Sequence, residues 1–184
     1  MYVGLTTPII AELDVAAGTY SNGFKCGAAV ETNVDPKYAE AEWEGDNVVV
    51  GKRKKFQKAD ITLKVTTLPI QAAKSLFGHT VDVTGKKITY GEADIAPYVG
   101  FGFVTEITDD DSVTTYEANW LPKVQFSEGG NQLKTSGTAL TLSNPQLTGT
   151  ALADSTRKWK DVEVFATETL AIAWITGKAN IIEG

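Results

Sequence analysis

Apolar and polar residues alternate with a period of two along most of this chain, which is the pattern of strands that bury one face. In the clearest case, Ile61, Leu63 and Val65 alternate with polar neighbours, and in the last case Val162 and Val164 do the same. The pattern also covers residues 115–120, 139–143 and 147–151. One apolar and one polar face per strand predicts a mainly β fold, an antiparallel β-sandwich or barrel around a shared core.

Turn-forming residues separate these alternating segments. Ser-Asn-Gly at 21–23 predicts a reversal between the first two strands, and Asp-Asp-Asp-Ser at 109–112 predicts a hairpin loop. Further reversals are expected at 44–46, 84–86 and 128–131.

Two segments depart from the alternation and predict helices. The first covers about 68–77, with Thr67 as a suitable N-cap and Gly78 as a suitable C-terminal stop. The second covers about 168–177, after Thr167, and is apolar nearly all round. We expect this second helix to be buried or to meet a partner with its outer side. A terminal strand remains open as an alternative there, although the alanine content favours helix.

Composition places the chain among ordinary globular proteins. Of its 184 residues, 42% are hydrophobic and 22% charged, which is enough for one domain spanning residues 1–184 with a real core. No run of about 18 apolar residues is present, so we expect no membrane insertion. The start lacks the features of a signal peptide, so we expect synthesis in a cytoplasm. The net charge of −6 argues against a protein that grips DNA.

The residues needed for common active sites are scarce. Cys26 is the single cysteine and His79 the single histidine, which excludes thiolate or multi-histidine metal sites and limits any triad to one base. The setting of His79 indicates a helix end. Gly100 and Gly102 lack the third glycine of a phosphate loop, and indicate a strand that approaches another layer closely. The acidic run at 109–111 lacks calcium-loop spacing. We therefore expect no cofactor, no metal and no catalytic residues, and a protein that is not an enzyme.

The region of most unusual character lies at about 40–58 and predicts a long hairpin arm. An acidic turn, three successive valines and a basic run follow one another there. The basic run is able to bind phosphates or a membrane surface, but the acidic balance of the chain favours pairing with Glu40, Glu42 and Glu44 of a neighbouring copy. A plain solvated face stays open as a third alternative. The candidate contact residues of the arm are Trp43, Glu44, Asp46, Val48, Val49, Val50, Lys52, Arg53, Lys54 and Lys55.

A series of short motifs, in this order and spacing, resembles a known family. The motifs are Ile61–Val65, Leu68-Pro69, Leu76–His79, Ala96–Gly102, Trp120–Phe126, Leu147–Thr150 and Lys158-Trp159. Together they resemble the major tail protein of long, non-contractile bacteriophage tails, the phi13-like family. The resemblance is good from about Ala59 to Trp174 and weaker in the first 55 residues.

The resemblance implies a structural virion protein that forms stacked hexameric rings, the tail tube. It implies strands lining a lumen, a long loop reaching the adjacent ring, and genome delivery by transient passage of DNA. The implied partners are other copies, a tape-measure protein, and tail terminator and tip proteins. The implied location is the phage tail, with assembly in the host cytoplasm. Polar strand faces such as that of Thr62, Lys64 and Thr66 suit a wet lumen, and the arm around Val48–Val50 suits ring-to-ring contact.

Two alternatives stay open from the sequence. An Ig-like or carbohydrate-binding β-sandwich module would account for the strands and for the four tryptophans, with Trp43 as an exposed stacking residue. Trp120, Trp159 and Trp174 lie in apolar patterns and are expected in the core. The tube subunit of a contractile injection apparatus would assemble through the same kinds of contact. Only the presence of a sheath around the tube distinguishes that system from a non-contractile tail.

Overall fold

The computed structural model describes residues 1–45, 48–82, 84–128 and 144–181, and for 43–45 and 48–50 it describes the backbone alone. The helices are α1 (Gln71–Phe77) and α2 (Glu168–Lys178). The strands are β1 (Tyr2–Asp14), β2 (Thr19–Lys25), β3 (Ala29–Gly45), β4 (Val48–Val65), β5 (Thr80–Val81), β6 (Ile88–Thr89), β7 (Tyr98–Thr108), β8 (Thr114–Glu128), β9 (Gln146–Ala151) and β10 (Asp161–Phe165). The predicted mainly β fold with two short helices is confirmed.

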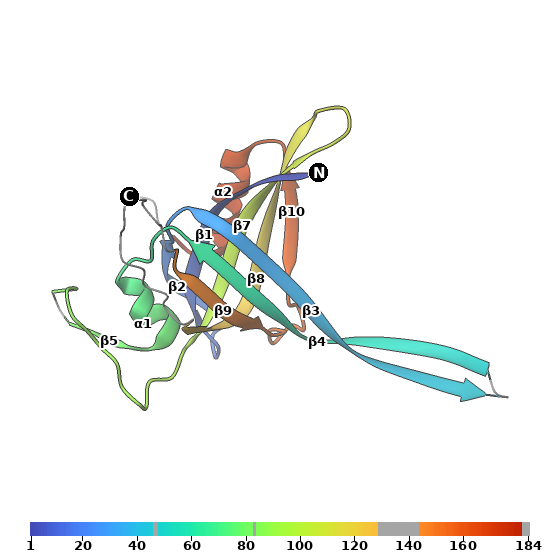
Figure 1. Cartoon of the computed structure of the whole chain (residues 1–184), viewed down its shortest axis with the longest axis horizontal. Helices are drawn as coiled ribbons and strands as arrows, with labels where there is room; N and C mark the ends of the chain where they lie inside the picture. Colours follow the sequence, from blue (N-terminus) through green and yellow to red (C-terminus); the bar gives the residue numbers. More distant parts are fainter. Residues whose placement is uncertain (46–47, 83, 129–143, 182–184) are drawn as a thin grey trace, which may run out of the picture.

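Eight of the described strands form one antiparallel sheet in the order β2-β1-β7-β8-β9-β4-β3, and β10 also pairs with β8. The sheet divides along β8, because residues 116–120 pair with β10 and residues 124–128 pair with β9. The sheet therefore folds back as a sandwich, with β9, β4 and β3 lying over β1, β7 and β8 (Figure 1). Strands β5 and β6 form a separate hairpin.

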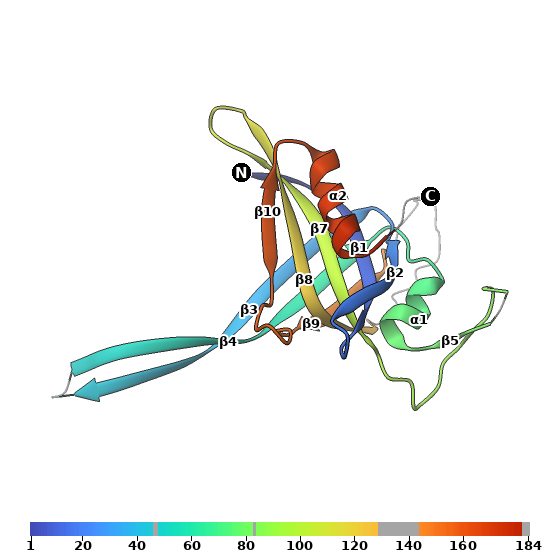
Figure 2. The same ribbon diagram turned by 180° about the vertical axis from the view of Figure 1, so that it is seen from behind.

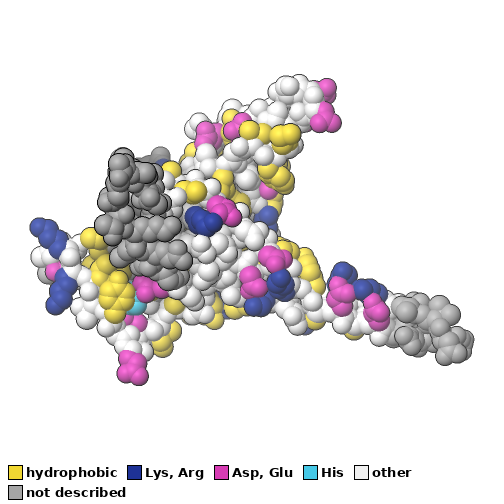
Figure 3. Space-filling model, in the orientation of Figure 1, with side chains coloured by type: hydrophobic (Ala, Val, Ile, Leu, Met, Phe, Trp, Pro, Cys, Tyr) yellow, Lys and Arg dark blue, Asp and Glu magenta, His cyan; other side chains and the backbone are white. Residues whose placement is uncertain are grey.

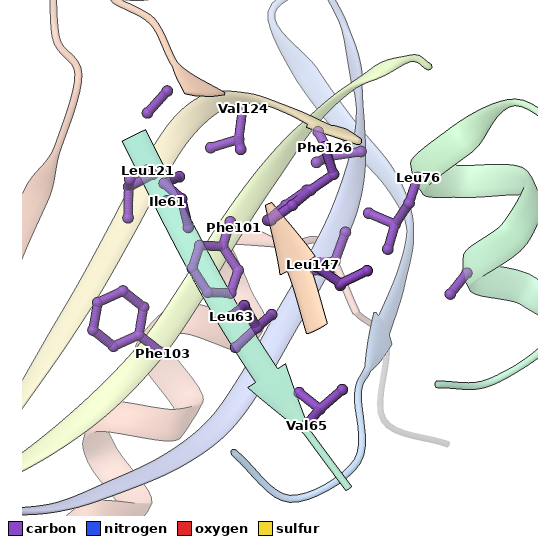
Figure 4. Packing of buried hydrophobic residues seen from close by; sticks show 14 of the residues in the cluster. Ile61, Leu63, Val65, Leu76, Phe101, Phe103, Leu121, Val124, Phe126 and Leu147 are labelled. Atoms are coloured by element: carbon purple, nitrogen blue, oxygen red, sulfur yellow. The ribbon is translucent and has the colours of Figure 1, made fainter. Parts of the chain in front are cut away.

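The main core lies between these two layers (Figure 4). The alternating residues of β4 point inward as the sequence predicts, and Ile61 and Leu63 are 2% and 0% exposed. They meet Phe101 of β7, whose ring packs edge-on against Phe126 of β8 with centroids 5.6 Å apart. Helix α1 closes one end of the core with Leu76.

Helix α2 covers the outer face of the layer formed by β1, β7 and β8 (Figure 2). Its Ile175 packs over Gly102, where an added Cβ would lie 2.0 Å from Cγ2 of Ile175 and 2.7 Å from the Trp120 ring. The glycine therefore permits the close approach predicted from the sequence. The predicted helix at 168–177 is confirmed, and because Leu170 is 54% exposed it is not buried all round.

The start of α1 differs from the prediction. Thr67 does not cap the helix, since the N-cap is Ile70 in helical conformation and no side chain caps the helix start. The chain before α1 is instead held at Gly27, whose N–H donates to the Thr67 carbonyl at 3.1 Å. Gly78 ends the helix as expected, with a left-handed φ of 76°. No helix in the described part of the chain is long and apolar enough to span a membrane.

The first predicted turn is wrong. Residues 21–23 lie inside β2, and the chain reverses at 15–18, where Gly18 has a φ of 67°. The Asp14 carboxylate holds this turn by accepting hydrogen bonds from the N–H groups of residues 16 and 17. Asn22 keeps a positive φ within the strand, and its side chain donates to Glu12 at 2.8 Å. The turn-forming residues at 21–23 therefore form an irregular part of β2, beside a bulge in β1.

The predicted face of β10 is also wrong. Val162 and Val164 are 47% and 57% exposed, while Phe165 points to α2 and lies 6.3 Å from the Trp174 ring. Positions 161, 163 and 165 pair with the β8 residues that α2 covers, so the helix and not the main core sets the buried side here. The strand predicted at 139–143 lies outside the described residues, and so does most of the turn at 128–131.

Candidate assembly surfaces

The arm is a two-stranded ribbon made of the distal halves of β3 and β4. The strands pair along their length, from Ala29 opposite Val65 to Gly45 opposite Val48, and the distal part projects away from the body (Figure 1). Asp46 lies outside the described residues and Val50 belongs to β4. Trp43 lies opposite Gly51, Glu44 opposite Val49, Lys52 opposite Glu42, Arg53 opposite Ala41, Lys54 opposite Glu40 and Lys55 opposite Ala39.

One face of the arm holds a network of ion pairs within the same chain. Lys52 lies 2.7 Å from both Glu40 and Glu42, and Lys54 lies 2.6 Å from Glu40. These hydrogen bonds lower the pKa of Glu40 to about 2. Within one chain, Glu40 and Glu42 thus already have partners in the basic run, and their pairing with a neighbouring copy stays a prediction. The paired lysines and glutamates stand directly opposite or diagonal to each other on the two strands of the arm, which places them within ion-pair distance.

The other face of the arm has a different character. Ala39 and Ala41 lie opposite Lys55 and Arg53, so two long cationic side chains flank two small ones. No ion pair to Arg53 or Lys55 is found among the described side chains. One face of the arm thus carries ion pairs, and the other carries two cationic side chains beside two alanines.

Three aromatic side chains form a clasp at the base of the arm: Tyr38 of β3, Phe56 of β4 and Trp159 of the β9–β10 connection. The rings of Phe56 and Trp159 are stacked with centroids 4.6 Å apart and planes 10° apart, and Tyr38 meets Phe56 edge-on at 6.0 Å. Phe56 and Trp159 also pack against the main core. The clasp therefore fixes the point from which the arm leaves the body. The sequence shows Trp159 as an expected core residue, but no periodicity links it to the arm.

Strand β10 provides an open sheet edge. Among the described residues it pairs with β8 alone, so its outer N–H and C=O groups have no partner strand. The exposed Val162 and Val164 stand beside this edge. Unpaired edges with apolar side chains recruit further strands, and most proteins protect them with charges or bulges. Along this edge, Glu163 is the one exposed charge between the two valines.

His79 lies at the end of α1, as the sequence predicts, and its ring sits between two carboxylates. Nδ1 is 2.7 Å from Oδ2 of Asp94, and Nε2 is 3.3 Å from Oε1 of Glu128. The hydrogen bond from the ring is the main cause of the lowered pKa of Asp94. The imidazole thus joins the end of α1 to the segment before β7 through Asp94, and Glu128 at the end of β8 lies near its second nitrogen.

The other reactive or acidic residues considered from the sequence have structural roles. Burial raises the pKa of the Cys26 thiol to about 12, so it is a poor nucleophile. Asp109 caps its own hairpin by accepting hydrogen bonds from the N–H groups of Asp111 and Val113. Within the described residues, no three side chains among the His, Cys, Asp and Glu residues gather as a metal site would require.

Comparison with known proteins finds a likeness to solved structures. No protein-family model matches the sequence, and no curated protein matches it. The cap that terminates the tube of the anti-feeding prophage, determined by cryo-EM, matches with a TM-score of 0.45 and 10% sequence identity. The match covers 85% of this chain and 87% of that one. A likeness of this size carries no argument about function, which must come from the residues and geometry of the chain itself.

Proposed function

We propose that this chain is the tail tube subunit of a long, non-contractile bacteriophage tail. Copies join side by side into six-membered rings, and the rings stack into a tube through which the genome is delivered. The proposal joins the order of motifs in the sequence to one structural observation, the projecting arm. Ring number, the tape-measure protein and the terminator and tip proteins follow from the family resemblance.

The arm carries the proposal because it has no partner within its own chain. Beyond the aromatic clasp, the ribbon leaves the body and packs on nothing that the structure describes (Figure 1). An isolated two-stranded hairpin is marginally stable in water. Ion pairs between exposed side chains, such as Lys54 with Glu40, add little because water screens the charges. A long arm of this kind gains its stability by lying on another molecule, and a neighbouring ring supplies one at high local concentration.

The open edge of β10 supports lateral association. Joining a strand edge of one copy to an edge of the next satisfies the free backbone groups and buries Val162 and Val164, which are 47% and 57% exposed in the single chain. A head-to-tail contact of this kind closes into a ring when the rotation between copies permits it. A closed ring has no unpaired edge, so growth then proceeds only by stacking.

We also propose that the chain performs no catalysis. Its one histidine is held between Asp94 and Glu128, and its one cysteine has a raised pKa. The carbohydrate-binding alternative depends on Trp43, whose side chain lies outside the described structure, because the other three tryptophans are expected in the core. Trp120 is 1% exposed, and Trp159 and Trp174 pack against the two cores.

Electron microscopy of concentrated purified protein tests the proposal. We expect rings and tubes in negative stain, with a matching fast species in sedimentation velocity. A species that stays monomeric at high concentration in several salts would overturn it. Glycan-array binding by that stable monomer would favour the carbohydrate-binding module.

The arm itself is tested by shortening. Replacing residues 40–54 with Asn-Gly joins Ala39 to Lys55, which already lie opposite each other, through a two-residue turn. We expect this variant to fold and to form rings that do not stack. Tubes of normal length from it would remove the arm from ring-to-ring contact while leaving the ring proposal in place.

A further inference from the structure

The outer face of β3, β4 and β9 is a sheet surface that no other described element covers, and we call it the polar face. It points away from the main core, and neither helix covers it in the described structure (Figure 3). One row of uncharged side chains crosses it and continues onto β8: Asn33, Thr62, Thr148 and Ser127. Between Glu31 and Lys37 of β3, and along Lys58–Val65 of β4 and all of β9, none of the large apolar side chains is exposed. The face is therefore suited to water and not to a dry contact.

On the body of the polar face, at positions 31–37 of β3 and 58–64 of β4, each lysine is paired with a carboxylate on the same face. Lys64 lies 2.5 Å from Glu31, Lys37 lies 2.5 Å from Asp35, and Lys58 lies 2.9 Å from Asp60. Two of these pairs each lie within one strand, and they offset the repulsion between like charges that stand opposite each other, such as Asp35 and Asp60. Three positive and three negative charges sum to zero.

This neutrality has a consequence for a phosphate polymer. A lysine that neutralises a DNA phosphate releases a condensed counterion, and each such contact contributes to affinity and to its dependence on salt. A lysine that already holds a carboxylate must lose that partner to bind a phosphate. A surface with paired charges therefore attracts DNA little, while its ions and hydroxyls keep it wet. An unpaired acidic surface would also prevent adhesion, but its negative charge would repel the DNA phosphates.

We propose that the polar face lines the channel of the tube, and that the pairing of its lysines keeps double-stranded DNA from adhering during passage. The inference rests on the proposed function, because a channel exists only in the assembly. The other surfaces fit contacts between copies better: β10 carries exposed valines, and the opposite face of the β1–β7–β8 layer is covered by α2. The arm continues the same two strands, so stacking through the arm would align the polar faces of successive rings.

Labelling of assembled tubes tests the location of the face. Thr148 is exposed at its centre, so Thr148→Cys is made in a Cys26→Ala background. In tubes we expect reaction with a small maleimide and loss of reaction with a maleimide coupled to a folded protein too wide for the channel. The same variant, unassembled, serves as the control and must react with both reagents. Reaction with both in tubes places the face outside, and reaction with neither buries it between copies, so either result overturns the assignment. Failure to form tubes counts against the proposed function instead.

The charge pairing is tested on the unassembled protein, which makes that test independent of tube formation. Glu31→Gln, Asp35→Asn and Asp60→Asn together remove the three carboxylates with little change of shape and leave three unpaired lysines. We expect this triple variant to bind duplex DNA, with a log–log salt slope of roughly −0.9 for each phosphate neutralised. The matched control carries Asp110→Asn, Asp111→Asn and Glu163→Gln, which change the net charge equally on other surfaces. Equal DNA binding by the two triple variants would overturn the role of the pairing.

Discussion

The ring of Phe56 in β4 is stacked on the indole of Trp159, with centroids 4.6 Å apart and planes 10° apart. The two residues are far apart in sequence, and the contact joins the arm to the connection between β9 and β10. Because both rings also pack on the main core, the direction of the arm is coupled to the body. Assembly through the arm requires that coupling, since a ribbon free to swing would lose entropy when it docks.

Removing the indole should loosen the arm without unfolding the body. Trp159 is partly buried, so we expect Trp159→Ala to cost about 2 kcal/mol, below the 3–5 typical of fully buried aromatic residues. Trypsin should then cleave the basic run of the arm faster, and tubes should be fewer. Tyr38→Phe is the matched control, because it keeps the edge-on ring contact and should behave as the parent. Equal proteolysis of parent and Trp159→Ala would show that the clasp does not hold the arm.

The approach of α2 to the sheet provides a second prediction. At Gly102 an added methyl group would lie 2.0 Å from Cγ2 of Ile175, so Gly102→Ala should push the helix outward and destabilise the protein by about 1–3 kcal/mol. Gly177→Ala is the control within α2 itself, since nothing lies within 4 Å of its added methyl group. That change should stabilise the helix by about 0.5–1 kcal/mol. Urea unfolding of both variants measures the two free energies, and a neutral Gly102→Ala would refute the tight packing.

The sequence predicted those parts of the fold that depend on local pattern. Ile61, Leu63 and Val65 alternate and all face the core, and both helices lie where the alternation stops. The face of β10 was mispredicted because alternation reveals a buried side without revealing which layer buries it. There, α2 buries Phe165 and leaves Val162 exposed.

In the arm too, local pattern predicted some features, and others depend on strand register and topology. An apolar triplet between charged flanks indicated a projecting arm, because such a segment fits poorly in a compact turn. The pairing of Lys52 with Glu40 within one chain depends on strand register, which the sequence left open. The contact of Phe56 with Trp159 depends on how β9 and β10 attach to β8, so no local pattern predicts it.

The ion pairs of the arm predict an unusual titration. Hydrogen bonds from Lys52 and Lys54 lower the pKa of Glu40 from 4.5 to about 2. The sign follows from the depressed folded value: the pairing supports the arm above the ordinary pKa and is lost as pH falls through about 2. Carboxyl-carbon NMR should therefore find Glu40 titrating near the lower value. In a variant with Lys52→Met and Lys54→Met the midpoint should rise toward the ordinary value. An unchanged midpoint would contradict the pairing.

The edge of β10 supplies the last prediction, which separates lateral association from stacking. Val162→Lys with Val164→Lys places two charges beside the free edge, the means by which many proteins prevent strands from pairing between molecules. Both valines are about half exposed, so stability should change by no more than about 0.5 kcal/mol for each substitution. Rings should be lost, and with them tubes, whereas the shortened arm should lose tubes alone. Val162→Thr with Val164→Thr keeps the branched shape and the strand preference without charge, and should still form rings. Intact rings from the lysine variant, seen in negative stain at the concentration where the parent assembles, would exclude β10 from the lateral contact.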